Sequence, residues 1–437
     1  MIDEFLYKPL EEKTISKIQR FKINNKDLRE LRLSFRNKTV LISGAAGSIG
    51  SQFSKDIWNY KLKPKKIIFL DKDENLLTEL NRNLLLLNNF KKIKTEFVCL
   101  DLTSMNLDDF LSTKKIQFYL NFAALKHVRS EESIESIKYM FKTNSISFIP
   151  KKNNNLEKIF SISTDKTVNP SSILGISKNL MEMNLERFSK RKIFSSSARF
   201  SNVAYSNGSI LKYIADRIVQ RKKFGIPSGV RRFFITHGEA SNLCLKSLLK
   251  RNNKKIIIPS PIVLNQDYLI SDLANKIIRE FNFTPKFYKK GNIKKNYKNK
   301  ICYVLLTPLS DGQKPYEELI SDEEYIYEDT DDSICKVDLP EYDKGTSVKP
   351  NLKFPRFQLG YATHLGRGVS LHSNVGASQR IYSASFIPTR SVQDYDLQDI
   401  IYSASLEDAS AFSNSVGSNA ITIQRVYYKT NAASWNY

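Results

Sequence analysis

Three closely spaced glycines, Gly44, Gly47 and Gly50, are the first residues with a spacing suited to chemistry. They stand in the segment GAAGSIG, after a short apolar run and before a helical pattern, where glycine lets a pyrophosphate approach the backbone. Asp71 ends a second apolar run about twenty residues further on, where a carboxylate accepts both hydroxyls of an adenosine ribose. Because this carboxylate repels a 2′-phosphate, the pattern predicts NAD rather than NADP, a preference moderated by Lys72. The alternative is a glycine turn with an unrelated surface aspartate.

A second polar group, Thr164, Asp165 and Lys166, follows another apolar run. In a doubly wound sheet, the carboxyl ends of the strands are where ligands make their contacts. A carboxylate and an amine side by side can move protons during a reaction. The alternative interpretation is an ion pair at the end of a strand.

Both groups need a sheet that brings the ends of separate strands together. Short β-branched and aromatic runs at 39–43, 65–71, 95–101, 116–124 and 157–164 alternate with segments of helical periodicity. Strands alternating with helices at this interval specify a parallel sheet covered on both faces. The predicted fold class is therefore α/β, a doubly wound Rossmann sheet.

Six segments, in order along the chain, carry a family resemblance. With the spacing GxxGxxG, they resemble the UDP-N-acetylglucosamine 4,6-dehydratases, extended short-chain dehydrogenases/reductases of surface-polysaccharide and nonulosonic-acid biosynthesis. The segments are DKDENLLTELNRNL (71–84), NFAALKHVRSEES (121–133), SISTDKTVNPSSILGISKNLME (161–182), ARFSNVAYSNGSIL (198–211), RRFFITHGEA (231–240) and DGQKPYEEL (311–319).

The composition and the resemblance together divide the chain into four segments. We expect a polar lead-in over 1–37, an NAD-binding Rossmann domain over 38–205 and a nucleotide-sugar substrate lobe over 206–340. Elements of the lobe are expected to interleave with the Rossmann domain. An atypical tail rich in serine and alanine occupies 350–437.

The resemblance also implies roles for the polar group at the strand end. In that family a hydride leaves C4 of the sugar for the nicotinamide, water is lost across C5–C6, and the hydride returns to C6. Asp165 would protonate the departing 6-hydroxyl, Lys166 would take the C5 proton, and Thr164 would orient the 4-hydroxyl. Lys178 stands where the superfamily's YxxxK lysine holds the nicotinamide ribose.

Two departures from the family pattern are visible. Leu174 occupies the tyrosine position of YxxxK, where some retaining members carry methionine, and leucine has no polar atom to take a proton. The 4-hydroxyl proton would then go to Asp165 or to a water held by Thr164 and Lys178. The segment 144–163 is also short, and Pro150 predicts a truncated helix there.

The resemblance extends to further contacts, and no metal site is expected. Asn202 matches a diphosphate-contacting asparagine, and the Arg232 guanidinium suits phosphate oxygens. A purely structural histidine is an equal alternative for His127. The cofactor residues implied are Gly44, Gly47, Ser48, Ile49, Gly50, Asp71, Asp101, Leu102, Ala123, Ala124 and Lys178; the substrate residues are Lys126, His127, Asn202, Arg232 and Lys314.

The 437 residues carry a net charge of +23. A basic protein attracts polyanions, but the lysine runs lack aromatic interleaving, so we expect no nucleic-acid partner. Four cysteines lie far apart, and neither a signal peptide nor an apolar run of membrane-spanning length is present. We therefore expect a cytoplasmic protein that inserts in no membrane and binds a UDP-sugar, and we expect a homo-oligomer.

The tail differs in charge from the rest of the chain. Residues 361–437 contain five basic and five acidic side chains, so the whole net charge lies before them. The tail is interpreted as a small β-rich appendage, with the run AITIQRVYY at 420–428, as an oligomerisation strand, or as a foreign fused sequence. We expect it to be poorly packed and dispensable for the active site.

Three functions are thus consistent with the sequence. The leading one is an NAD-dependent 4,6-dehydratase acting on UDP-GlcNAc. A nucleotide-sugar 4-epimerase shares the fold but needs no Asp–Lys pair for elimination. A non-catalytic protein that binds NAD and a nucleotide sugar is the interpretation that Leu174 favours.

Overall fold

The computed structural model describes residues 2–16, 19–127, 133–150, 155–189, 191–264, 266–289, 297–298, 300–309, 314–329, 331–340, 347–348, 369–375 and 380–386. For residues 2–5, 297–298 and everything after 340, only the backbone is described. The run at 420–428 and most of the tail lie outside these residues, so the expectations made for them stay predictions.

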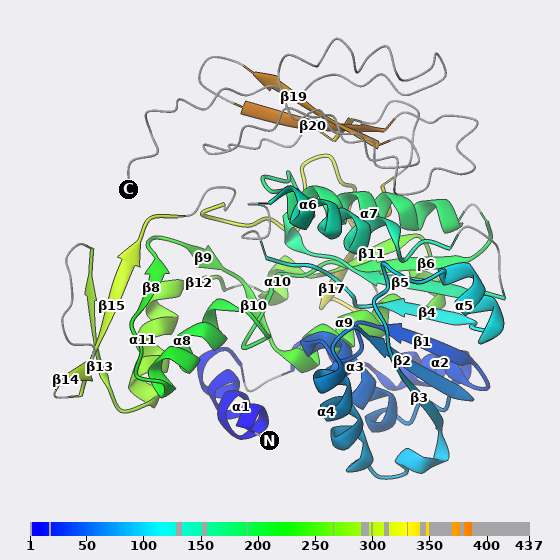
Figure 1. Ribbon diagram of the computed structural model, residues 1–437, viewed down its shortest axis with the longest axis horizontal. Coiled ribbons are helices and arrows are strands. Elements are labelled where there is room, and N and C mark those ends of the chain that lie inside the picture. The colour runs from blue at the N-terminus through cyan, green and yellow to red at the C-terminus, as the bar shows by residue number, and fades with distance from the viewer. Residues whose placement is uncertain are drawn as a thin grey trace.

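A nine-stranded sheet forms the centre of the protein (Figure 1). Its strands follow the order β3-β2-β1-β4-β5-β6-β11-β17-β16; neighbours from β3 to β11 run parallel, and β17 and β16 add antiparallel pairs. The strands are β1 (Thr39–Ser43), β2 (Lys66–Asp71), β3 (Lys94–Cys99), β4 (Phe118–Asn121), β5 (Lys158–Ile162), β6 (Phe194–Ala198), β11 (Lys255–Pro259), β16 (Tyr327–Glu328) and β17 (Ile334–Asp338).

Helices cover both faces of this sheet, which confirms the doubly wound α/β fold. In Figure 1, α6 and α7 lie above the sheet, while α3, α4 and α9 lie below it. Every residue of β1 and β5 is buried, as expected of strands between two helical layers. The helices are α2 (Asn25–Phe35), α3 (Ser48–Asn59), α4 (Glu74–Leu85), α5 (Leu107–Thr113), α6 (Ile134–Phe141), α7 (Ile173–Ser189), α9 (His237–Ser247) and α10 (Pro261–Leu264).

A smaller lobe is built around a second sheet, in which β15 pairs with β13, β14 and β8. Two short two-stranded pairs, β7 with β10 and β9 with β12, lie between the lobe and the large sheet (Figure 1). The lobe's elements are α8 (Ile210–Val219), α11 (Ile270–Glu280), β8 (Phe224–Pro227), β13 (Thr284–Tyr288), β14 (Tyr297–Lys298) and β15 (Ile301–Thr307); the short strands are β7 (Asn202–Val203), β9 (Arg231–Arg232), β10 (Phe234–Ile235) and β12 (Tyr268–Leu269).

The N-terminal segment contributes to both hydrophobic cores. Helix α1 (Ile2–Thr14) buries Tyr7 and Leu10 in the core of the smaller lobe, whereas α2 buries Leu31 and Phe35 in the core of the large sheet. Asp27 of α2 is buried and binds Arg251 through two hydrogen bonds of 2.7 and 2.9 Å. The first 37 residues therefore link the two cores.

The helical segment before β5 ends ahead of Pro150, as that proline predicts. Helix α6 continues into a single π-helical stretch, Lys142–Ile146, which ends before Pro150. A π turn of this kind is rare and frequently occurs at functional sites. Its Asn144 is fully buried.

Three strands from the last part of the chain form a separate antiparallel sheet: β18 (Ser347–Val348), β19 (Val369–Val375) and β20 (Arg380–Phe386). Strand β20 contains the first of the two YSAS repeats of the sequence. Across the described part of the chain, no helix combines the length and the apolar character that a membrane crossing requires.

Candidate active site

The glycine turn connects β1 to α3 at the carboxyl edge of the large sheet. Gly44 has φ +67°, and a Cβ there would overlap the Ala123 nitrogen after β4. A Cβ on Gly50 would overlap the Gly44 carbonyl. Helix α3 begins at Ser48, and its N-cap residue, Gly47, has no side chain to occupy the first amide groups. These amides and the helix dipole suit the pyrophosphate of a dinucleotide.

Asp71 ends β2 beside this turn, and backbone amides hold both of its oxygens. Oδ2 accepts from the Ala46 amide at 2.9 Å, and Oδ1 accepts from the Asp73 amide at 3.2 Å. Lys72 donates to the Tyr139 hydroxyl at 3.2 Å, and Tyr139 donates to Asp101 at 2.6 Å. The glycine turn and the Asp71 carboxylate therefore have the arrangement expected of a dinucleotide site.

The remaining residues expected at the cofactor follow β3 and β4. Leu102 is buried after β3, next to Asp101. Ala123 donates its amide to the buried Asn121 at 3.2 Å, and Ala124 beside it is exposed. Since β3 and β4 flank the β1–β2 pair, these positions lie along the same edge as the glycine turn.

Thr164, Asp165 and Lys166 follow β5 and form one hydrogen-bonded group. Asp165 is almost fully buried, and its Oδ1 accepts from Thr164 Oγ1 at 2.8 Å and from Lys166 Nζ at 3.1 Å. Its other oxygen accepts from Ser201 Oγ at 3.1 Å. The structure thus brings the predicted acid, base and hydroxyl together.

Glu317 is a fourth member of this group that the sequence did not identify. Its Oε1 lies 3.7 Å from Lys166 Nζ and 3.7 Å from Arg232 Nη2, and the residue is 5% exposed. Burial raises the pKa of the Glu317 carboxyl. Burial works against the Lys166 ammonium, but the charges of Asp165 and Glu317 outweigh it and raise its pKa. The segment DGQKPYEEL holds Glu317 three residues after Lys314, and this carboxylate was the available signal.

Lys178 lies on α7 under the same strand and is buried. Its Nζ donates to the Ile162 carbonyl at 2.9 Å, and burial lowers its pKa to about 7. Leu174, one turn earlier on α7, is also buried. The site therefore has an amine, Lys178, that titrates near neutrality. Leu174, at the tyrosine position of YxxxK, supplies no hydroxyl.

Asn144 is a second residue that sequence reasoning missed. Its amide oxygen accepts from the Leu125 amide at 2.8 Å, and its Nδ2 donates to the Leu125 carbonyl and to Ser177 Oγ, both at 2.9 Å. It therefore joins the segment after β4 to α7 next to Lys178. Asn144 lies in the π-helical stretch, which a short sequence pattern does not predict.

Two of the predicted substrate residues, Arg232 and Lys314, donate to backbone carbonyls around the segment that carries Glu317. The Arg232 guanidinium donates to the carbonyls of Arg231, Lys314 and Pro315 at 2.6–3.0 Å. Lys314 Nζ donates to the Val168 carbonyl at 2.9 Å. These bonds fasten the segment of Glu317 to β9 and to the loop after Lys166.

Asn202 lies in β7, and Lys126 and His127 lie against the loop between β7 and α8. Asn202 donates to the Phe233 carbonyl at 3.4 Å, and Lys126 Nζ lies 3.5 Å from Ser206 Oγ. The His127 ring packs against Gly208 so closely that a Cβ on Gly208 would overlap it. The structure therefore brings Lys126 and His127 to this loop.

Residues 40–338 match the family described as polysaccharide biosynthesis protein. The chain belongs to this family. An uncharacterized membrane protein of Methanocaldococcus jannaschii is 32% identical over 313 residues, which make up 68% of this chain and 85% of that protein. CapD of Staphylococcus aureus and EpsC of Bacillus subtilis are matched over 47% of their length, so the chain spans about half of each.

Relatives of this polysaccharide biosynthesis protein include two kinds of named enzyme. UDP-N-acetylglucosamine 4,6-dehydratase (inverting) of Campylobacter jejuni is 26% identical over 56% of this chain and 74% of its own. UDP-glucose 4-epimerase of Rickettsia bellii is 27% identical over 66% of this chain and 80% of its own. Among solved structures, Pen from Bacillus thuringiensis shares the fold, with a TM-score of 0.54 and 21% identity over 70% of this chain and 88% of its own.

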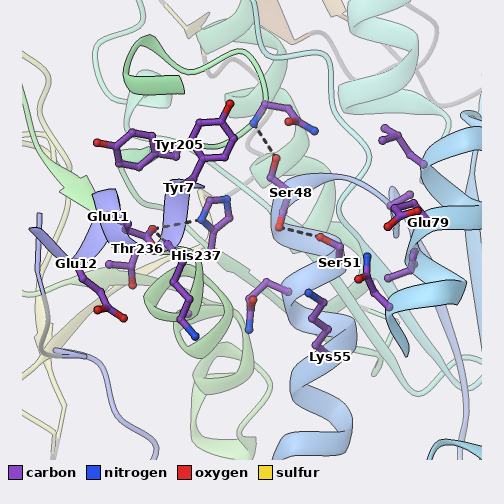
Figure 2. Close-up of a pocket in the computed structure, with 18 of the residues that line it drawn as sticks. Tyr7, Glu11, Glu12, Ser48, Ser51, Lys55, Glu79, Tyr205, Thr236 and His237 are labelled. Atoms are coloured by element: carbon purple, nitrogen blue, oxygen red, sulfur yellow. Dashed lines mark hydrogen bonds and ion pairs between the residues drawn. The ribbon is translucent and has the colours of Figure 1, made fainter. Parts of the chain in front are cut away.

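A cavity of about 520 Å³ lies beside the glycine turn of this family member (Figure 2). Helix α3 lines it with Ser48, Ser51 and Lys55, while α1 and the start of α9 form the facing wall. The cavity reaches the turn at Ala46 and Ser48, but neither Asp71 nor the group of Thr164, Asp165 and Lys166 lines it. Its α1 wall lies outside the residues matched by the family.

Proposed function

We propose that this protein is an NAD-dependent nucleotide-sugar 4,6-dehydratase that converts UDP-GlcNAc into a UDP-4-keto-6-deoxy sugar. The observation that carries the proposal is the group of Thr164, Asp165 and Lys166, joined by hydrogen bonds at the carboxyl edge of the sheet. A 4-epimerase does not require a base at C5 or an acid at the 6-hydroxyl. The dehydratase among the relatives supports the same reading.

The glycine turn and Asp71 would hold the cofactor, and NAD, when bound, supplies the hydride acceptor. Asp71 favours NAD over NADP because a 2′-phosphate would meet its carboxylate. Lys178 would hold the nicotinamide ribose from below. Asn144 would keep α7, and with it Lys178, in register with the segment after β4.

The elimination needs one proton shared by Asp165 and Lys166. A proton that passes from the Lys166 ammonium to Asp165, 3.1 Å away, leaves an amine and a carboxylic acid. The Lys166 amine then takes the C5 proton, while Asp165 gives its proton to the 6-hydroxyl, which leaves as water. The step leaves the pair as an ammonium and a carboxylate. When C6 is reduced, the Lys166 ammonium gives a proton back to C5, and the proton released from the 4-hydroxyl makes up for it, so the pair again holds one proton.

Because Leu174 cannot accept a proton, a water held between Thr164 and Lys178 takes the proton of the 4-hydroxyl. Asp165 already accepts three hydrogen bonds, whereas Lys178 titrates near neutrality. A neutral Lys178 can take the proton that this water receives. Thr164, which donates to Asp165, orients the sugar hydroxyl.

The test of the function is a product assay with the full chain. Protein incubated with NAD and UDP-GlcNAc is expected to form a nucleotide sugar lighter by one water, detected by mass spectrometry. A product of unchanged mass with inverted C4 would establish the epimerase instead, the function that the Rickettsia relatives favour. Bound NAD with unchanged substrate would contradict both and support a non-catalytic binding protein.

Glu317 is expected to set the pH range of the reaction through Lys166. A nearby carboxylate favours the ammonium, so Glu317→Gln lowers the pKa of Lys166. Because the Asp165–Lys166 pair must hold one proton, activity falls above that pKa. The alkaline limb of the pH–kcat profile should therefore move to lower pH in Glu317→Gln.

The matched control is Glu318→Gln, since Glu318 is exposed and pairs with Asn169 at the surface. Its pH profile should overlay that of the wild type. An alkaline limb that stays in place in Glu317→Gln would show that Glu317 only holds the loop of Lys314.

A further inference from the structure

Tyr205, in the loop between β7 and α8, has an unusual backbone conformation. Its φ is +53°, in the left-handed region that disfavours residues with bulky side chains. Of the eleven non-glycine residues with positive φ in the described part of the chain, ten are exposed asparagine, lysine or arginine. Tyr205 is the eleventh, and it is buried. Neighbouring structure must therefore hold it in place.

Helix α1 provides the groups that hold Tyr205. The rings of Tyr7 and Tyr205 stack with centroids 5.8 Å apart and planes inclined by 26°. The Tyr205 hydroxyl lies 3.0 Å from the buried hydroxyl of Thr14, at the end of α1. Burial raises the pKa of Tyr205, so its phenol stays neutral. Figure 2 shows the two tyrosines side by side on the cavity wall that faces α3.

Helix α1 is itself anchored to the smaller lobe. The Tyr7 hydroxyl donates to Asp216 of α8, and the Lys212 ammonium lies 3.9 Å from the centre of the Tyr7 ring. Glu11 accepts from the His237 amide at 3.0 Å, at the start of α9. Thus α1 contacts the lobe on one side and the helix below the large sheet on the other.

The residues that follow Tyr205 reach the two segments expected to bind ligands. The Asn207 amide donates to Ser48 Oγ, at the start of α3, at 2.9 Å. Gly208, with φ +74°, lies under the His127 ring. A shift of Tyr205 would therefore move the contacts made with the glycine turn and with His127.

We propose that α1 is a positioning element of the dinucleotide site, which acts through Tyr205 on the loop 205–209 and on Ser48. The helix lies outside the residues 40–338 that match the family. The inference rests on the cofactor-binding part of the proposed function and not on the reaction. Tyr205 and Thr14 are positioning residues, because they contact Ser48 only through the loop.

The test is the affinity of the full chain for NAD, measured by calorimetry, in Tyr205→Gly, Thr14→Val and Ser48→Ala. Tyr205→Gly relieves the backbone strain but removes the ring, and we expect it to weaken NAD binding by about 5- to 20-fold. Thr14→Val should weaken it several-fold through the same loop. Tyr205→Phe, which keeps the stack on Tyr7, should recover most of the affinity lost in Tyr205→Gly.

A double-mutant cycle separates positioning from simple stabilisation. If α1 acts through the loop on Ser48, the loss of affinity in Thr14→Val/Ser48→Ala should be smaller than the product of the two single losses. The inference would be overturned if the loss in the double variant equalled the product of the two single losses. It would also be overturned if the variants lowered the melting temperature and left the NAD affinity unchanged. If the wild type binds NAD and these couplings hold while no dehydrated product forms, the dehydratase proposal fails and the inference stands.

Discussion

Replacing Lys166 by methionine is expected to lower kcat for water loss from the nucleotide sugar by about 10²–10⁴-fold, the range typical of a lost acid–base group. Methionine keeps the length of the side chain but has no proton to give and no amine to accept one. Exchange of the C5 proton with solvent deuterium should fall in parallel, because Lys166 is the proposed base at C5. NAD affinity should stay unchanged, since Lys166 contacts Asp165 and Glu317 and not the glycine turn.

The control for this variant is Lys222→Met, an exposed lysine shortly after α8. It removes the same charge without touching the site, and its kcat should equal that of the wild type. A Lys166→Met protein that loses water at the wild-type rate would remove Lys166 from the mechanism. Loss of NAD affinity in that variant would show instead that the substitution disturbs the whole edge of the sheet.

Replacing Arg199 by methionine is expected to destabilise the protein by about 3–5 kcal/mol, the cost of leaving a buried charge without its partner. Arg199 is 2% exposed and binds Glu182 and Glu324, each at 2.8 Å. Glu182 is fully buried and also accepts from Ser163 Oγ at 2.6 Å, directly before Thr164. The measurement is urea denaturation followed by far-UV circular dichroism.

The matched control is Arg231→Met, which breaks the exposed ion pair with Asp267. Because this pair is exposed, its loss should lower the free energy of unfolding far less than the loss of Arg199 does. The double variant Glu182→Leu/Arg199→Met should regain much of the stability lost in Arg199→Met, because it removes the second buried charge as well. Equal losses in the two arginine variants would show that the buried network contributes no more than a surface pair.

The parallel sheet was predictable because each of its first strands corresponds to a short apolar run in the sequence. The run TVLIS at 39–43 is strand β1 with the predicted bounds, and the glycine turn follows it directly. Other bounds moved inward: the run expected at 116–124 forms a strand only from Phe118 to Asn121. Beyond Asn121 the chain turns away to carry Ala123 past Gly44, a contact between distant segments that no local period describes.

The lead-in over 1–37 shows a different limit. The sequence showed a polar lead-in, but it did not show that α1 joins the core of the small lobe while α2 joins that of the large sheet. Amphipathic patterns indicate that a helix has an apolar face, and they do not name the surface that covers it. The left-handed backbone of Tyr205, stabilised by Tyr7 and Thr14, follows from that packing and has no counterpart in sequence.

The sequence by itself determined the fold class, the family and the close grouping of Thr164, Asp165 and Lys166, because neighbours in the chain at the end of one strand must lie together. Only the tertiary structure decided what surrounds them. Glu317 comes from a segment about 150 residues away, and it meets Lys166 because Arg232 and Lys314 fasten that segment beside the site. Burial and neighbouring charge set the pKa of each buried group, and both arise only when distant segments pack against one another.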